Sequence, residues 1–183
     1  MLTPLTLLMA LSSADARAGD ALSLEAALQA HPTAPGSVAP AGAVRIGVGR
    51  LTAAGEGRAL GEGAWIGRAT GTVDLLGRSD RLDLTVGGFA GLAGGLESGS
   101  GATPTYGIEL GAGLHLGRFE ARYRRAMGLI GPLSGALSED ELRAGIRVGE
   151  DRRALVFGQA VHLRAPADGV STTGLGAGLA LRF

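Results

Sequence analysis

The stretch that decides the fold is Leu175-Gly176-Ala177-Gly178-Leu179-Ala180-Leu181-Arg182-Phe183. Its odd positions carry leucine, alanine and phenylalanine, and its even positions carry glycine, alanine and arginine. Because successive side chains of a strand point to opposite faces, this order gives one apolar face and one face of small and charged residues. Such a strand fits between hydrocarbon and a wet lumen. We therefore predict a membrane-spanning strand.

The same alternation recurs upstream and predicts eight strands in all. They cover residues 43–51, 64–76, 81–92, 105–116, 118–126, 141–149, 153–164 and 172–183. The facing of the seventh strand is ambiguous, because the polar Gln159 shares a side with Leu155, Phe157, Val161 and Leu163. A bulge or a reversed facing both remain open there.

The predicted connections alternate in length. Short turns cover 77–79, 117 and 150–152, whereas longer segments rich in Gly, Ser, Pro or acidic residues cover 52–63, 93–104, 127–140 and 165–171. Short turns on one rim and long loops on the other are typical of an outer-membrane barrel, with the short side periplasmic. A β-sandwich would mix the two lengths without regard to side.

The chain end, with Leu179, Leu181 and Phe183, resembles the C-terminal signal strand of bacterial outer-membrane β-barrels, whose closing aromatic is read by the barrel-assembly machinery. In size and strand count, residues 43–183 resemble the small OmpX and OmpA-domain barrels. The resemblance implies an all-β, eight-stranded, antiparallel, up-and-down transmembrane barrel in the bacterial outer membrane. Its implied partners are membrane lipid or lipopolysaccharide and, during biogenesis, the assembly machinery; we expect a monomer.

The N-terminal region predicts export. A short apolar run ends at Leu11, and Ala16-Arg17-Ala18 fits the small-x-small cleavage rule, so residues 1–18 are interpreted as a signal peptide. No Lys or Arg precedes the run, so the true start could lie upstream or the segment could be a frayed arm. Residues 19–42 are interpreted as a periplasmic helix and linker, with Ser23 as N-cap and a stop before Pro32.

Composition excludes several classes of protein and site. The chain has no cysteine, so it forms neither disulfides nor thiolate metal sites. Its 17 basic residues balance 17 acidic ones, which does not favour a nucleic-acid partner. The Gly-x-Gly runs recur within strands and precede no helix, so we assign no cofactor.

The alternation of inward and outward positions along each predicted strand places many charged residues on the lumen side. They are Arg45, Arg68, Arg81, Arg122, Arg124, Arg143, Arg147 and Arg182, with Asp74, Asp83, Glu109, Glu120 and Glu141. Unpaired ions removed from water cost several kcal/mol each, so these side chains should pair, and arginine can bind a carboxylate through two hydrogen bonds. We favour a structural ladder that fills a narrow barrel over an ion-selective lumen.

The predicted interface anchors are Trp65, Tyr106 and Phe119, since aromatic rings are favoured at both membrane surfaces. The predicted function is a structural or surface-interaction role, with a narrow porin-like conduit as the alternative. A further alternative is a lipid-modifying enzyme resembling PagL, in which His162 would act with Ser171 or Ser134. No close spacing supports such a site, so we assign no catalytic or metal-binding residue. A soluble lipocalin-type barrel would instead place its apolar residues inside.

Overall fold

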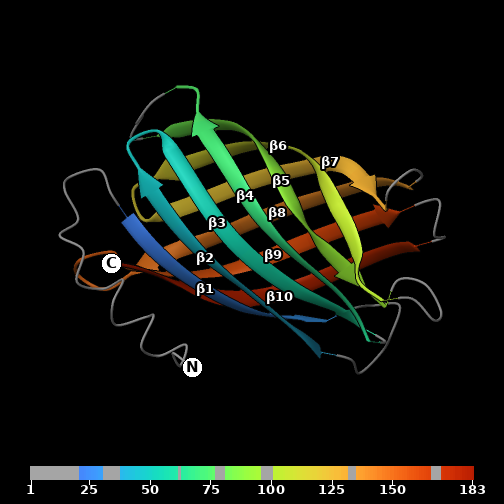
Figure 1. Cartoon of the computed structure of the whole chain (residues 1–183). Helices are drawn as coiled ribbons and strands as arrows, with labels where there is room; N and C mark the ends of the chain where they lie inside the picture. The colour runs from blue at the N-terminus through green and yellow to red at the C-terminus, as the bar shows by residue number, and fades with distance from the viewer. Residues whose placement is uncertain are drawn as a thin grey trace, which may run out of the picture.

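The computed structural model describes residues 21–30, 38–61, 63–76, 81–95, 101–131, 135–165 and 170–183. Ten antiparallel strands form a closed up-and-down barrel in which β1 pairs with β10 (Figure 1). The strands are β1 (Ala21–Ala30), β2 (Val38–Val48), β3 (Leu51–Gly61), β4 (Ala64–Asp74), β5 (Leu82–Gly94), β6 (Thr103–Leu116), β7 (Phe119–Ile130), β8 (Gly135–Val148), β9 (Ala154–Ala165) and β10 (Val170–Arg182). The signal peptide interpreted over 1–18 lies outside the described residues.

The prediction of eight strands is wrong, because β1 and β3 were not expected. Residues 23–31 were predicted to be a short helix, but Leu22, Leu24 and Leu28 also alternate with period two, and β1 pairs with strands on both sides. Residues 52–63 were predicted to be a loop. The outward residues of β3 after Leu51 are only Gly and Ala, so its alternation in hydrophobicity is weak. Residues 21–30 and 38–42, where a helix and a linker were predicted, therefore belong to strands of the barrel.

The two rims differ less in loop length than predicted. The connections at 49–50, 75–81, 117–118 and 149–153 form the turn rim, where β1 also begins and β10 ends. The connections at 31–37, 62–63, 95–102, 131–134 and 166–169 lie at the other end, the loop rim. Strands β7 and β8 occupy most of the segment predicted as a loop over 127–140. Two-residue turns such as Gly117-Arg118 use a glycine with positive φ, which that residue adopts without strain.

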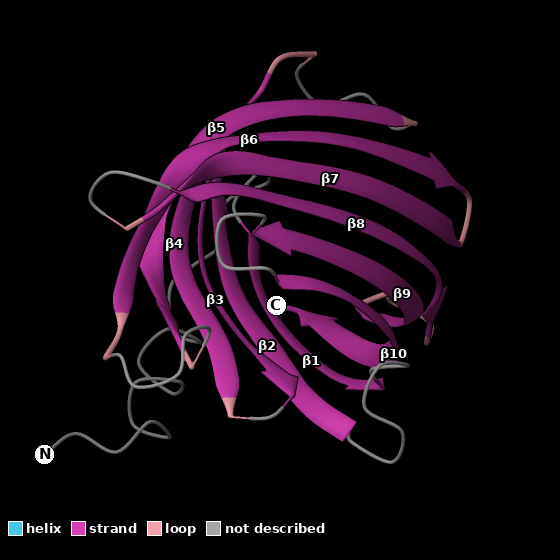
Figure 2. Cartoon of the chain, turned by 90° about the vertical axis from the view of Figure 1, so that its right-hand side faces the viewer, coloured by secondary structure: helices cyan, strands magenta, loops and turns pink. Residues whose placement is uncertain are grey.

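The barrel wall has an apolar outside and a lumen of mixed character. Large apolar side chains such as Ile108 (53 % exposed) and Leu175 (55 % exposed) point outward around the barrel. Figure 2 shows the ring of strands from the end on the right of Figure 1. The facing of β9 is now defined: Leu155, Phe157 and Leu163 are buried inside together with Gln159. No helix in the described part of the chain is long and apolar enough to cross a membrane.

The wall is irregular on both sides of β3: the β3–β4 ladder shifts register between Ala59 and Gly61, and the β2–β3 ladder is short. The β2–β3 ladder runs from Val48 and Leu51 only as far as Ala41 and Arg58, although both strands continue toward the loop rim. Pro40 follows on β2 and has no backbone N–H to donate. An apolar groove of about 500 Å³ lies here, lined by Pro40, Ala41, Gly42, Gly57, Arg58, Ala59, Trp65, Ile66 and Gly67.

Candidate functional site

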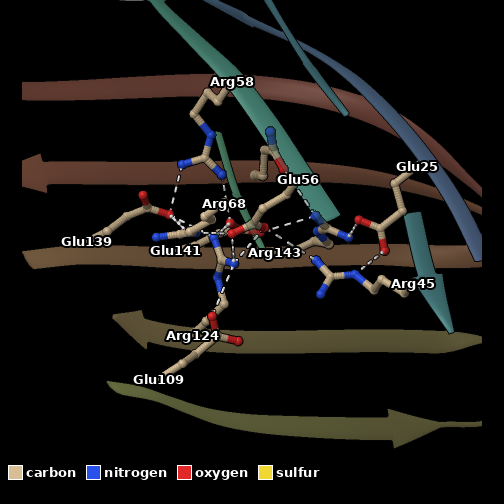
Figure 3. A network of polar contacts seen from close by, with 11 residues as sticks. Glu25, Arg45, Glu56, Arg58, Arg68, Glu109, Arg124, Glu139, Glu141 and Arg143 are labelled. Atoms are coloured by element: carbon tan, nitrogen blue, oxygen red, sulfur yellow. Dashed lines mark hydrogen bonds and ion pairs between the residues drawn. The ribbon is translucent and has the colours of Figure 1, made fainter. Parts of the chain in front are cut away.

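A network of charged side chains fills the middle of the lumen (Figure 3). The central network consists of five arginines and five glutamates: Arg45, Arg58, Arg68, Arg124 and Arg143, with Glu25, Glu56, Glu109, Glu139 and Glu141. These residues come from β1, β2, β3, β4, β6, β7 and β8, so the network connects opposite sides of the wall. Its formal charge is zero if every member is ionised.

Glu139 accepts hydrogen bonds from three arginines. Its Oε1 lies 2.9 Å from Arg58 Nη1, 2.7 Å from Arg68 Nη2 and 2.7 Å from Arg124 Nη2. The Glu139 side chain is 1 % exposed. A carboxylate removed from water needs such compensation, because burying an unpaired ion is strongly unfavourable.

Arg124 holds the centre of the network from β7. Its Nη1 donates to both oxygens of Glu56 at 2.7 Å, and its Nη2 also reaches Glu141 Oε2 at 2.8 Å. Glu109 lies 3.5 Å from the same guanidinium. Arg68 adds a further hydrogen bond to Glu56. The planar guanidinium fork thus bridges carboxylates from several strands, a geometry that lysine could not reproduce.

Glu25 joins β1 to the network at the side nearer the turn rim. It accepts from Arg45 Nε at 3.1 Å and from Arg143 Nη1 at 2.8 Å. The Arg143 guanidinium also lies over the ring of Phe157, 4.1 Å from its centroid. This cation–π contact and the ion pairs fix the orientation of Arg143.

A cluster of buried apolar side chains, the apolar layer, lies in the lumen between the central network and the loop rim. It is formed by buried residues from β3, β4, β5, β7, β8 and β9: Leu60, Ile66, Phe89, Ala93, Ala126, Ile130, Leu137, Leu163 and Ala165. Arg68 touches this layer through Phe89, whose ring centroid lies 5.3 Å from its Cζ. The inward face of β9, ambiguous in the sequence, contributes Leu163 and Ala165 to this layer, whereas Leu155 and Phe157 pack with Ala180 in a second cluster.

A polar vestibule of about 290 Å³ occupies the end of the lumen at the turn rim. Glu120 and His115 line it together with Asp83. His115 Nε2 lies 3.1 Å from Asp83 Oδ2, and Arg147 Nη2 donates to Glu120 Oε2 at 2.5 Å. The lumen therefore has three layers along its axis: vestibule, central network and apolar layer.

The charged residues predicted to face the lumen divide between two layers. Arg45, Arg68, Glu109, Arg124, Glu141 and Arg143 belong to the central network; Asp74, Asp83, Glu120, Arg122, Arg147 and Arg182 line the vestibule, as Arg45 also does. Arg81 is exposed at the turn rim just before β5. Sequence reasoning missed Glu25, Glu56, Arg58 and Glu139, because it assigned their segments to a helix or to loops. The period-two spacing of Glu56 and Arg58 was the available signal.

The aromatic residues predicted as anchors point outward. Trp65 and Tyr106 are exposed near the loop rim, and Phe119 and Phe183 are exposed near the turn rim. Leu179 and Leu181 are also exposed outside, on β10. Phe183 is tied to β1, since its N–H donates to the carbonyl of Leu22 at 2.9 Å.

Outward polar side chains on β7 to β10 form a polar collar that runs from near the loop rim on β10 to mid-strand on β7: Arg125, Asp140, His162, Arg164, Ser171 and Thr173. His162, considered above as a catalytic residue, lies here with its Nδ1 2.9 Å from Thr173 Oγ1. Ser134 lies outside the described residues. Within the described ranges, no three His, Cys, Asp or Glu side chains are grouped to hold a metal ion.

No protein-family model matches this chain, and no curated protein matches it either. Among solved structures, it is similar to the N-terminal β-barrel domain of Pseudomonas aeruginosa OprF, at 9 % identity and a TM-score of 0.42, covering 90 % of this chain and 99 % of that chain. It is also similar to a loop-deletion mutant of OmpT, an outer membrane protein of Vibrio cholerae, at 9 % identity and a TM-score of 0.35, covering 91 % and 100 %. Likenesses at this level assign the chain to neither group.

Proposed function

We propose that this chain is an integral outer-membrane barrel protein with a closed lumen and a structural or surface-interaction role. The observation that carries the proposal is the inversion of polarity across the wall. Large apolar side chains are exposed on the outside, while ion pairs such as Glu139 with Arg124 are buried inside. A barrel in water would expose its charged residues and bury its apolar ones, whereas hydrocarbon reverses that preference.

The closed lumen favours a structural role over conduction. The central network blocks the axis with paired side chains, and the layer beyond it is mostly apolar, with the Thr105 hydroxyl as a buried polar group at its level. A narrow porin-like conduit would have to pass both layers. We therefore place the interacting surface outside the lumen, at the end of the polar collar nearest the loop rim, where the exposed Arg164 can contact phosphate groups of lipopolysaccharide.

The proposed location is tested by fractionating the envelope of a cell that produces the full chain. We expect the protein in the outer membrane, extracted by detergent but not by high salt. It should migrate faster on gels when unheated, because a closed barrel stays compact in detergent. Recovery in the aqueous fraction would contradict the proposal. Mass spectrometry of the envelope protein should show an N-terminus after Ala18, and retention of Met1 would contradict the signal-peptide interpretation.

Conduction is tested separately by planar-bilayer recording of the purified barrel. The two closing layers predict no lasting conductance. A large, long-lived conductance of the monomer would reject the closed lumen and support a conduit, while leaving the membrane location intact.

A further inference from the structure

The vestibule contains an arginine that forms no ion pair with any residue that the structure describes. Arg122 lies inward on β7 and lines the vestibule. Its Nε is buried and has no hydrogen-bond partner among the described residues, and no carboxylate there lies within 4.0 Å of its guanidinium. A buried polar atom without a partner is unfavourable, so a ligand or water is expected to bind beside it.

The acids of the vestibule are already engaged elsewhere. Glu25 pairs with Arg45 and Arg143, and Glu120 pairs with Arg147. Asp83 contacts His115 through Oδ2. Asp74 Oδ1 accepts from the backbone N–H of Leu76 at 3.0 Å. Neutralisation of Arg122 by these groups is therefore incomplete.

The remaining charge in the vestibule is positive. Arg45, Arg147 and Arg153 pair with Glu25, Glu120 and Asp151. The lining arginines outside these pairs are Arg50, Arg122 and Arg182, against the two carboxylates Asp74 and Asp83. A water-filled cavity with excess positive charge and low-dielectric walls concentrates anions. The 290 Å³ of the vestibule leave room for one beside Arg122.

A second unpartnered donor lies diagonally across the wall. The hydroxyl of Thr85 on β5 is buried without a hydrogen-bond partner and also lines the vestibule. Between Thr85 and Arg122, β6 presents Gly111 and Gly113, over which the Thr85 hydroxyl and the Asp83 carboxylate lie. A guanidinium and a hydroxyl facing one polar space are the donors that bind an oxyanion.

We propose that the vestibule binds a small free oxyanion of the phosphate or sulfate type, with Arg122 as its principal ligand. This site is separate from the proposed surface role, and it requires only the folded barrel. The competing possibility is an ordered water that links Arg122 to the unpartnered Oδ1 of Asp83.

The experiment is calorimetric titration of the full chain, folded in neutral detergent in a chloride buffer, with inorganic phosphate. We expect saturable binding, weakened at least ~10-fold in Arg122→Gln, because a charged hydrogen bond is lost. Arg118→Gln, at the same rim but outside the vestibule lining, is the matched control and should bind as the native chain does. Unheated gel mobility verifies that each variant is folded.

Thermal unfolding provides a second readout. Without phosphate, Arg122→Gln should be as stable as the native chain or more so, because it removes an uncompensated charge. Phosphate should raise the melting temperature of the native chain and of Arg118→Gln, but not of Arg122→Gln. No phosphate binding by the native chain, or equal binding by Arg122→Gln, would overturn the proposal in favour of bound water. Binding of short-chain phosphatidic acid without binding of inorganic phosphate would also overturn it.

Discussion

Arg143 on β8 donates to Glu25 on β1 across the lumen, with 2.8 Å between Nη1 and Oε2, although 118 residues separate them in the chain. Strands β9 and β10 lie between β8 and β1 in the wall, so this ion pair does not follow the sheet ladder. It crosses the lumen and ties the N-terminal strand to the C-terminal half of the barrel. Closure of the barrel by β1 is therefore stabilised by ion pairing inside the lumen.

A double-mutant cycle on Glu25 and Arg143 should show strong coupling. Glu25→Gln and Arg143→Gln each leave a charged partner in the lumen, so the double variant should be more stable than the two single effects predict, by ~0.5–3 kcal/mol. Urea unfolding in lipid vesicles measures it. The exposed pair Asp151 and Arg153, 3.7 Å apart, is the control and should couple by less than ~1 kcal/mol. Equal coupling energies in the two cycles would contradict the burial of the Glu25–Arg143 pair.

Glu139→Gln should be strongly destabilising. The amide keeps an acceptor oxygen but removes the negative charge that three arginines share, and breaking a buried ion pair costs ~3–5 kcal/mol. The neighbouring Asp140→Asn makes the same chemical change at an outward pair with Arg125, 3.8 Å away, and should cost ~1 kcal/mol or less. Similar unfolding free energies for both variants would show that Glu139 is not the buried acceptor of the network.

Val44→Arg should distinguish lipid from water outside the barrel. Val44 points outward at mid-strand of β2, between Leu24 and Gly55, and an arginine at the bilayer midplane costs ~2–4 kcal/mol. Val48→Arg, on the same face of β2 but at its end, should cost ~0–1 kcal/mol. Refolding into vesicles compares them. A water-facing wall would instead give changes within ~0.5 kcal/mol at both positions.

The single tryptophan provides a direct test of the membrane boundary. Trp65 is 40 % exposed on the outside near the loop rim, so its fluorescence should be quenched by lipids brominated near the headgroup and little affected by aqueous iodide. In the control variant Trp65→Phe with Phe157→Trp, the indole lies in the lumen and should escape lipid quenching. Strong iodide quenching of Trp65 without lipid quenching would contradict the proposed membrane contact.

Phe183→Asp should impair assembly. The residue lies at the β1–β10 closure, where its backbone is bonded to Leu22, and its ring is exposed outside near the turn rim. A carboxylate there loses the interfacial ring. The amount of heat-modifiable barrel in the outer membrane should fall, whereas Phe183→Tyr, which keeps the ring, should restore it. A normal level for Phe183→Asp would contradict this assignment.

The sequence predicted the barrel class where large apolar residues alternate with polar ones, as along β6 and β8. The prediction failed where the apolar residues are small, and where their spacing fits a helix as well as a strand. The leucines of β1 also fit a short helix, and β3 alternates only small outward residues with Glu56 and Arg58. Pairing with neighbouring strands decides both cases, and no single strand carries that information.

The sequence predicted a network of charged residues in the lumen, but it identified only some of the residues that form it. Arg124 and Glu141 follow from the parity of their strands, whereas Glu139 lies in a segment that Gly, Ser and Pro made resemble a loop. The inward apolar face of β9 could not be assigned from its pattern. Its partners in the apolar layer come from strands far away in sequence, and only the closed barrel brings them together.

The short ladder between β2 and β3 has an electrical consequence for the wall. A cavity of about 30 Å³ inside the lumen and the groove outside share Ala41, Gly42, Gly57, Arg58 and Ile66. In a bilayer, little more than a sheet of backbone would separate the Arg58 guanidinium from hydrocarbon at this place. The field of a net charge decays slowly in such a low-dielectric layer, whereas the field of a balanced set of ions decays within a few ångströms. The equal numbers of arginine and glutamate in the central network thus keep the electric field weak where the wall is thin.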